Sequence, residues 1–400
     1  MVVWICNPFD NLPGEDGRTQ RYTLLSEALI QAGHQVVFWS SDFRHFTKAK
    51  RKVPPVYCHN GIHVRQIPTV PYYRNIGLQR LWSHWRLAQD WKRLALTYVA
   101  ETQQKPDVIL CSSPPISLFR AEERLAKQFN VKIFLDVQDI WPETFYRVLP
   151  KWCHPFGTLL FMPLHLKIQR AYKRADGVSS VSGAYQSIIR RDDLKVFPLG
   201  ARLPKHLEDR TITHELRLCY IGNLGSGYPL EEVFAGTEQL IKNGKAVSLT
   251  VAGDGPKRGI VEHYAARYPN IRYMGFLGND GLERVLQNAD VGILPATANS
   301  GAVGANKIAD YGKCGLAILN GLEGPPAKML ADYSAGVPYQ VDNPLSFVEA
   351  VSGMLDNPSW VAQMGRNARQ MVEEQLDADK IYPAFARWLE EKAGSPFRAV

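Results

Sequence analysis

NADVGILPATANSGAVGANKIADYGKCGLAILN, residues 288–320, is the stretch that decides how the rest of the chain is interpreted. Its apolar run, Val291–Leu294, predicts a buried strand, and a loop of small residues follows. Asn306 is a suitable N-cap for a short helix that would run through Cys314 and stop at Gly315. The stretch therefore predicts a strand, a glycine-rich loop and a helix in succession.

Two charged residues of this helix suggest a binding site. Lys307 falls on the first turn, where a cation is mildly unfavourable unless an anion joins it at the positive end of the helix dipole. Asp310 is three residues on and shares a face with Lys307. A lysine, a carboxylate and the amides of the helix start can hold a phosphate and a polyol. A capped helix with an ordinary Lys–Asp surface pair explains the same residues equally well.

The same pattern of strands and helices recurs along both halves of the chain. A strand, a helix and a second strand at the start predict a parallel sheet, and the second half restarts this order. Strands are predicted at Val2–Cys6, 36–39, 106–112, 131–137, 177–181 and 195–199, and then at 217–221, Val247–Ala252, 271–274 and Val291–Leu294. Helices are predicted at 18–32, 74–102, 152–174, Leu230–Lys242, 259–268, 281–288, 306–314, 364–376 and 381–392, the last with Pro383 in its first turn.

Several motifs in order carry a resemblance to a known family. The pattern N-K-x-x-D-Y-x-x-x-G, residues 306–315, resembles the donor-site motif of retaining GT-B glycosyltransferases of the family 4 type. YIGNLGSGYPL at 220–230, VAGDGP at 251–256, MGFL at 274–277, G-x-x-x-R (Gly14, Arg18), G-H-x-V (Gly33, His34, Val36) and DIWPE at 139–143 resemble other family signatures. The resemblance covers nearly the whole chain. It implies a GT-B fold: two Rossmann-like, doubly wound parallel-sheet domains with a cleft between them.

The resemblance also implies an activity. It is that of a retaining hexosyltransferase that moves a hexose or N-acetylhexosamine from a nucleotide sugar, with a UDP-sugar as the expected donor and no essential metal. The expected acceptor is a glycan or a lipid-linked molecule, in the assembly of cell-surface polysaccharide or glycolipid. Two alternatives stay open, namely a nucleotide-sugar epimerase with the same fold and a non-catalytic homologue that binds a nucleotide sugar.

Site residues follow from the motifs position by position. Lys307 would stabilise the departing diphosphate, Asp310 would hold the donor ribose, and Asp139 would orient or deprotonate the acceptor hydroxyl. An Asp that caps the turn before Pro142 accounts for Asp139 equally well. The expected catalytic residues are Asp139, Lys307 and Asp310, and the expected donor-binding residues are Gly17, Arg18, Gly225, Gly253, Asp254, Phe276, Leu277, Gly304 and Asn306.

The sequence departs from the family pattern at two places. Many relatives carry two glutamates in the donor motif, whereas Ala302 and Asp310 occupy these positions here. Many also carry an Arg and a Lys after the glycine loop, and residues 226–232 contain neither. We therefore expect Lys307 to carry more of the phosphate binding, with help from Arg18.

Length and composition bound the class of protein. A chain of 400 residues with 45% hydrophobic and 22% charged residues predicts two folded domains and excludes a disordered chain. We expect an acceptor domain at 1–205, a donor domain at 206–378, and a terminal helix at 379–400 that packs back on the first domain. The six cysteines form no C-x-x-C pair and the start of the chain reads as a strand, so we expect reduced thiols in a cytoplasmic protein.

Basic residues gather in the first half. Residues 1–200 hold 27 Lys and Arg against 16 Asp and Glu, a balance of +11, whereas the remainder holds 20 against 23, a balance of −3. This asymmetry, and the basic aromatic stretch at 152–174, predict peripheral contact with an anionic membrane on the inner face of the cell. The expected membrane contacts are Trp152, Phe156, Lys167, Arg170, Lys173 and Arg174. For the similar stretch at 74–102, a helix with its apolar stripe in the core is slightly favoured. No nucleic-acid-binding motif is present, so nucleic acid is not expected as a partner.

Overall fold

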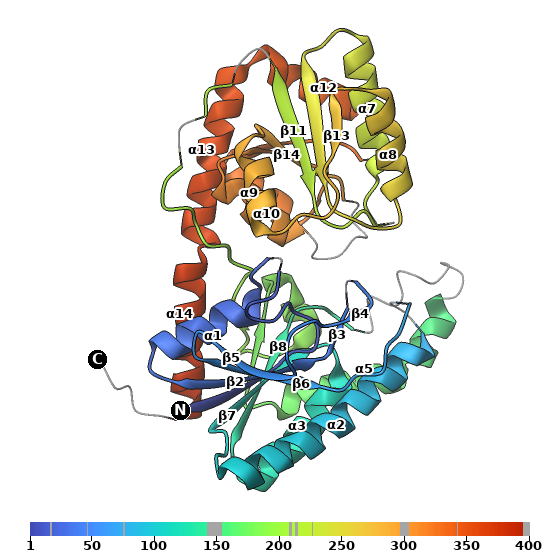
Figure 1. Cartoon of the computed structure of the whole chain (residues 1–400). Coiled ribbons are helices and arrows are strands. Elements are labelled where there is room, and N and C mark those ends of the chain that lie inside the picture. Colours follow the sequence, from blue (N-terminus) through green and yellow to red (C-terminus); the bar gives the residue numbers. More distant parts are fainter. Residues whose placement is uncertain are drawn as a thin grey trace. The chain divides into compact units, whose positions relative to one another are not determined.

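The computed structural model describes the chain except residues 17, 46, 75–76, 142–153, 208–209, 213–214, 226, 297–303, 342 and 395–400, and except the side chains of 154–156, 158–160 and 304–305. Gly17, Trp152 and the side chain of Phe156, all expected to be functional, therefore lie outside the described part. The chain forms two compact units: Met1–Pro198 with Lys380–Val400 is unit 1, and Leu199–Asp379 is unit 2 (Figure 1).

Unit 1 is built on an eight-stranded sheet with the order β10-β9-β8-β7-β1-β2-β6-β5. Neighbouring strands are parallel except β5 and β6, which are antiparallel. The strands are β1 (Val2–Cys6), β2 (Gln35–Ser41), β5 (Val56–His59), β6 (Ile62–Ile67), β7 (Val108–Ser113), β8 (Lys132–Val137), β9 (Gly177–Ser180) and β10 (Lys195–Val196). The short strands β3 (Phe43–Arg44) and β4 (Ala49–Lys50) pair separately.

Helices cover both faces of this sheet. They are α1 (Arg21–Gln31), α2 (Leu78–Thr102), α3 (Ile116–Phe129), α5 (His154–Arg174), α6 (Gln186–Ile189) and α14 (Ala378–Ala393). On one face, Trp91 of α2 packs edge-on against Trp4 and Trp39 of neighbouring strands, with ring centroids 6.4 Å apart in each case. Because side chains alternate along a strand, the opposite face carries its own apolar set. There the ring of Phe134 lies 5.3 Å from that of Trp388 in α14.

Unit 2 holds a six-stranded parallel sheet with the order β13-β12-β11-β14-β15-β16. The strands are β11 (Leu216–Ile221), β12 (Val247–Ala252), β13 (Ile271–Tyr273), β14 (Val291–Leu294), β15 (Ala317–Asn320) and β16 (Gly336–Pro338). The helices are α7 (Leu230–Lys242), α8 (Arg258–Arg267), α9 (Asn279–Gln287), α10 (Gly304–Lys313), α11 (Pro325–Asp332), α12 (Pro344–Asp356) and α13 (Pro358–Gln375). Figure 1 shows α7 and α12 on one side of this sheet and α13 on the other.

Each sheet has one point where the order of strands reverses. In unit 2 the chain passes from β11 outward through β12 and β13, then returns to start β14 beside β11. In unit 1 the corresponding neighbours are β1 and β7. Ligands of doubly wound sheets bind at the carboxyl ends of the strands that flank this switch point. The fold therefore selects one candidate region in each unit.

Some helix ends differ from the expectations. The helix α10 begins at Gly304, so Asn306 is a residue of its first turn and not its N-cap. The helix α1 begins at Arg21, three residues later than predicted, because the preceding loop extends through Gln20. The helix α14 starts at Ala378, which leaves Pro383 beyond its first turn. Pro383 is tolerated there because a proline removes only one backbone donor from a long, well-packed helix.

Candidate functional site

The ammonium group of Lys307 lies at the switch point of unit 2. Its side chain is only 7% exposed, and Nζ lies 3.8 Å from the ring centroid of Tyr228 and 5.0 Å from that of Tyr220. Within the described part of the chain, the ammonium forms no hydrogen bond and no ion pair. Aromatic faces attract a cation but replace only part of its hydration. The lysine is thus a buried cation without an anionic contact of its own.

Burial changes the proton affinity of this lysine. It lowers the pKa of Lys307 from 10.5 to about 7, and the charge of Asp310 opposes this shift only in part. Near neutral pH the ammonium is therefore easily lost, whereas an anion that reached it would favour the charged form. A lysine held in this way is suited to bind an anionic ligand such as a phosphate.

Glycines follow three neighbouring strands here, and one of them, Gly222, lies against Lys307. A Cβ at Gly222, whose φ is +116°, would lie 3.2 Å from Lys307 Cε, so glycine keeps the lysine against the backbone. A Cβ at Gly253 would lie 1.8 Å from the carbonyl oxygen of Gly222, closer than any atoms can approach. The amide of Gly222 donates to Ala252 O and that of Gly253 to Gly275 O, both at 2.8 Å. Gly253 is thus required for the contact between the ends of β11 and β12.

Tyr311 fixes α10 on the sheet. Its hydroxyl accepts from the amide of Ile221 at 3.2 Å and donates to Ile293 O at 3.1 Å, which joins β11 and β14 at the switch point. Gly292 makes room for the ring, because a Cβ there would lie 2.3 Å from Tyr311 Cγ. The tyrosine positions the helix that carries Lys307. It belongs to the N-K-x-x-D-Y motif, which could have singled it out.

The other expected residues of unit 2 occupy different surroundings. Asp310 is half-buried; its carboxylate lies 3.6 Å from Lys313 Nζ, and its charge also acts on Lys307. Asn306 is exposed on the first turn of α10, which Gly304 begins. Gly225 and Asp254 lie in the loops after β11 and β12, where Leu224 N donates to Asp254 O at 3.0 Å. Phe276 is 65% exposed and Leu277 half-buried in the loop after β13. Tyr220 and Tyr228 were not predicted, because only the folded loop turns their rings toward Lys307.

Two expected site residues belong to unit 1 and are described there alone. Asp139 follows β8, and its amide donates to Ser113 O at 3.4 Å, close to the end of β7. Its charge acts on Arg80 of α2 and favours the charged form of that guanidinium, although burial lowers the pKa of Arg80 overall. Arg18 lies in the loop between β1 and α1, where its carbonyl accepts from Asn11 Nδ2 at 3.3 Å.

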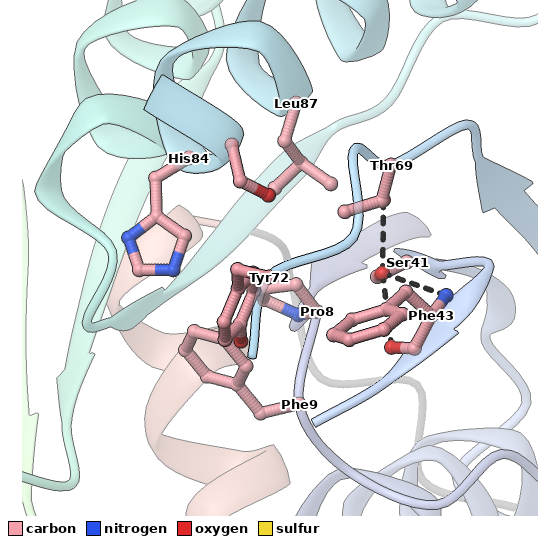
Figure 2. Close-up of a pocket in the computed structure, with 9 residues that line it drawn as sticks. Pro8, Phe9, Ser41, Phe43, Thr69, Tyr72, His84 and Leu87 are labelled. Carbon is pink, nitrogen blue, oxygen red and sulfur yellow. Dashed lines mark hydrogen bonds between the residues drawn. The ribbon is translucent and has the colours of Figure 1, made fainter. Parts of the chain in front are cut away.

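A small pocket lies near the same end of unit 1. Phe9, Tyr72 and His84 are among the residues that line it, and Figure 2 shows His84 pointing toward the rings of the other two. On its far side the Ser41 hydroxyl donates to Thr69 Oγ1 at 2.8 Å. The pocket has room for about one water molecule. The enclosed cavity itself is therefore too small to hold a sugar.

The first turns of α2 differ from the expectation for this helix. The first turns of α2 were expected to bury their apolar stripe, but Leu78, Leu81, Trp82 and Trp85 are 84%, 47%, 53% and 52% exposed. Their spacing of i, i+3, i+4 and i+7 places them on one helix face. Later in α2 the expectation holds, since Trp91 is fully buried. The sequence could not separate the two cases because an outward stripe and an inward one have the same periodicity.

The helix α5 carries the expected basic residues on its surface. Lys167, Arg170, Lys173 and Arg174 are exposed, and so are the apolar Met162 and Leu166. The helix runs through Pro163, as the predicted helix at 152–174 does. In the described residues, no helix is both long and apolar enough to cross a lipid bilayer.

Comparisons with known proteins agree with this architecture. Residues 17–199 match the family described as "Glycosyl transferase 4-like domain", and residues 215–357 match "Glycosyl transferases group 1". Two glycogen synthases from strains of Mycobacterium tuberculosis are 24% identical over 215 residues, which are 50% of this chain and 47% of theirs. The match thus spans about half the length of these curated relatives.

Solved structures resemble the chain over its full length. Sucrose-phosphate synthase from Thermosynechococcus elongatus has a TM-score of 0.74 at 16% identity and covers 98% of both chains. The Anabaena protein HepE, solved in complex with UDP and glucose, has a TM-score of 0.66 at 12% identity and covers 97% of this chain and 99% of its own. At such identities the likeness is one of fold, and it confirms the fold class expected from the sequence.

Proposed function

We propose that this chain, which has the GT-B fold and carries both domains of a glycosyltransferase, moves a sugar from a nucleotide sugar to an acceptor hydroxyl. The observation that carries the proposal is the buried ammonium of Lys307 at the switch point of unit 2. It lies where doubly wound sheets bind ligands and has no anionic contact among the described residues. A nucleotide diphosphate would supply the missing negative charge.

In this proposal each expected site residue has one task. Lys307, charged when the diphosphate is bound, neutralises the negative charge that grows on it as the bond to the sugar breaks. Asp310 holds the donor ribose, with Asn306 at the exposed start of the helix. Asp139 orients the acceptor hydroxyl and takes its proton. The transfer proceeds with retention of the anomeric configuration, and the task assigned to Lys307 requires no metal ion.

A UDP-sugar that carries a hexose or N-acetylhexosamine is the donor we propose. The support is the likeness of fold to HepE, a protein solved with UDP and glucose. The chain itself supports a diphosphate through its single buried cation on α10 and the close glycine loops at Gly222 and Gly253. The base is not distinguished by these features, so UDP is the first nucleotide to test.

Replacing Lys307 tests this function directly. In Lys307→Met the side chain keeps much of its volume but loses the charge, and UDP binding should weaken by at least about 30-fold, as when one partner of a buried charge pair is removed. Isothermal titration calorimetry with the full chain measures this. The matched control is Lys328→Met on α11, whose side chain is 75% exposed and pairs with Asp332. Equal UDP affinity in wild type and Lys307→Met would refute the assignment.

The pKa of Lys307 gives the same experiment a second readout. Because that pKa is about 7 in the free protein and a bound diphosphate raises it, UDP binding should weaken as the pH rises above about 7. Lys307→Met should lack this dependence. Incubation of the wild type with a UDP-sugar and no acceptor separates the epimerase alternative, since only an epimerase would convert the sugar.

We further propose that unit 1 rests on an anionic membrane on the inner face of the cell and takes a lipid-linked acceptor. The exposed apolar face of α2 and the exposed cations of α5 support this. Each Lys or Arg near an anionic surface contributes about 1 kcal/mol of binding, and salt screens this attraction. A few of them, helped by two exposed tryptophans, suffice for reversible attachment.

Sedimentation with liposomes tests the membrane proposal. The protein should pellet with anionic liposomes at low salt and be released in part at high salt, with the apolar face of α2 retaining the rest. Trp82→Ser with Trp85→Ser should abolish the salt-resistant fraction, and charge reversal of Lys167, Arg170, Lys173 and Arg174 should abolish the salt-sensitive one. The control is Trp360→Ser, which removes a tryptophan of unit 2 that is 45% exposed. A wild-type protein that stays in solution with anionic liposomes at low salt would indicate a soluble acceptor.

A further inference from the structure

A second group of cations lies at the strand ends of unit 1. The guanidinium of Arg80, on the first turn of α2, is 5.0 Å from the ring centroid of Trp141, 5.5 Å from that of Phe9 and 5.7 Å from that of Tyr72. These rings come from the segments that follow β8, β1 and β6. Arg80 therefore lies at the carboxyl edge of the sheet, near the switch point between β1 and β7.

Three more basic side chains surround the same rings. Lys48 Nζ is 4.7 Å from the ring centroid of Tyr72 and 3.3 Å from His45 Nδ1. The Nε–H of Arg80 donates to His84 Nε2 at 3.4 Å. His45 also contacts the hydroxyl of Tyr72 at 2.6 Å. Two segments, residues 45–48 and the start of α2, thus bring two strong bases and two imidazoles to one place.

The bases of this cluster disfavour one another's charge. Burial and the charge of Arg80 lower the pKa of Lys48 from 10.5 to about 8. Burial, Arg80 and Lys48 lower the pKa of His45 from 6.5 to about 3, and burial, Arg80 and His45 lower that of His84 well below its usual value. Both imidazoles are therefore neutral near pH 7, which leaves Arg80 and Lys48 as the cations. An anion bound between Arg80 and Lys48 would reduce the repulsion between these two cations.

The hydrogen-bond donors of the cluster suit a phosphate. A guanidinium presents paired donors that match two oxygens of a phosphate, and an ammonium adds a third contact at a variable angle. The ring centroids of Phe9, Tyr72 and Trp141 all lie within 5.7 Å of the guanidinium. Asp139 acts electrostatically on the same Arg80. The proposed base and the cation cluster are thus close enough to serve a single acceptor molecule.

We propose that the acceptor carries a phosphate or diphosphate group and that Arg80, assisted by Lys48, binds it. This inference rests on the function proposed above, because it takes Asp139 as the acceptor-side residue. It adds that the acceptor is recognised through phosphate chemistry, whether the phosphate belongs to a water-soluble sugar phosphate or to a lipid headgroup. His45 and His84 act as neutral hydrogen-bonding supports for the two cations.

Titration with inorganic pyrophosphate tests the inference on the full chain saturated with UDP. Wild type should bind pyrophosphate while UDP is bound. Arg80→Gln should weaken this binding by about tenfold or more, the loss expected for one hydrogen bond to a charged group, and Lys48→Gln should weaken it less. Arg93→Gln is the matched control, since Arg93 lies on the same helix and its side chain is 67% exposed. Pyrophosphate binding that UDP abolishes, or that Arg80→Gln leaves unchanged, would overturn the inference.

UDP affinity separates this test from that of the proposed function. Arg80→Gln should bind UDP as wild type does, which also shows that the variant is folded. If wild type failed to bind UDP, the proposed function would fall, whereas the pyrophosphate result in unit 1 would still be measured.

Competition identifies the source of the phosphate. Displacement of pyrophosphate by a hexose phosphate supports a soluble acceptor, and displacement by vesicles that contain an isoprenyl diphosphate supports a lipid-linked one. Both results support the inference. If neither displaces pyrophosphate, the cluster binds an adventitious anion only, and the inference is overturned.

Discussion

Two buried cations, Arg21 in unit 1 and Lys307 in unit 2, show opposite ways to place a positive charge inside an α/β unit. Arg21 is 3% exposed, and its Nε and Nη2 donate to the two carboxylate oxygens of Asp136 at 2.7 and 2.9 Å. Its Nη1 donates to Phe197 O at 2.8 Å. Asp136 in turn accepts from the hydroxyls of Tyr22 and Ser179. The guanidinium and the carboxylate of this network thus have each other, and further hydrogen-bond partners, within unit 1.

Lys307 is buried almost as deeply, but among the described residues its ammonium contacts aromatic rings and forms no ion pair. Burial lowers the pKa of both side chains, yet the charge of Asp136 and its hydrogen bonds outweigh this for Arg21, so the pKa of Arg21 is raised. For Lys307 the charge of Asp310 does not outweigh burial. The two cations thus differ in their partners: Arg21 has its anion inside the chain, whereas Lys307 forms no ion pair among the described residues and is the one that we propose for a ligand.

The largest effect should come from breaking the internal pair. Asp136→Asn leaves Arg21 buried without a negative partner, and this should lower the free energy of unfolding of unit 1 by about 3–5 kcal/mol. Urea unfolding followed by tryptophan fluorescence measures it, since eight of the nine tryptophans belong to unit 1. Lys127→Gln removes an exposed lysine from Glu123, whose carboxylate keeps Arg174 at 3.5 Å, so this control should cost less than about 1 kcal/mol. If the two variants lost similar amounts of unfolding free energy, the pair of Arg21 and Asp136 would be no more important to stability than a surface pair.

The same kind of change at Lys307 should act in the opposite direction. Lys307→Met removes a buried charge that has no internal partner, so unit 2 should become more stable by about 1–3 kcal/mol at pH 7. Hydrogen exchange of β11 and β14 measures this. In wild type the unfolded chain binds more protons than the folded one between pH 7 and 10.5, so stability should rise with pH over this range. Lys307→Met should lack this rise. If the variant instead made unit 2 less stable, the ammonium of Lys307 would have a stabilising partner inside the chain.

The smallest effect concerns the rings that face Lys307. Tyr228→Leu removes the closer ring, and because a cation–π contact contributes about 0.5–2 kcal/mol, UDP binding at pH 7 should weaken by roughly threefold or more. Tyr228→Phe keeps the ring and should bind UDP as wild type does. Calorimetry on both variants makes the comparison. A loss of binding in Tyr228→Phe would shift the role from the ring to the hydroxyl.

Local patterns predicted much of the fold to the residue. Val2–Cys6, Leu230–Lys242, Val247–Ala252 and Val291–Leu294 were predicted with the bounds that β1, α7, β12 and β14 have. Each of these four elements is a continuous apolar run or an amphipathic helix that ends at turn residues. Their bounds can therefore be predicted from residues that are close in sequence. The hairpin β5–β6 was not predicted, because β5 is mostly exposed and lacks a regular apolar alternation.

The candidate site was predictable in its motif but not in its surroundings. The N-K-x-x-D-Y motif led to Lys307, whereas the environment that lowers its pKa depends on Tyr220 and Tyr228, 87 and 79 positions earlier in the chain. The lysine also lies against the backbone at Gly222, where a Cβ would be 3.2 Å from Lys307 Cε, and this contact forms only in the folded unit. The same limit applies to Arg80, whose three aromatic neighbours come from three separate segments of unit 1.

The placement of α14 has a consequence for how the protein is made. Residues Lys380–Val400 belong to unit 1, so the whole of unit 2 is inserted between two segments of unit 1. Phe134 and Gly177 pack against Trp388, and a Cβ at Gly177 would lie 2.9 Å from that ring. During translation at about 5–20 residues per second, this apolar face waits roughly 10–40 s for its cover after residue 198 is made. Unit 2 is contiguous and can close first.

A nascent chain would therefore present an open unit 1 beside a finished unit 2. Chaperones that recognise exposed apolar surface would meet the first unit and not the second. Premature termination shortly before α14 would release chains that contain nearly all of unit 2 but lack the helix that completes unit 1.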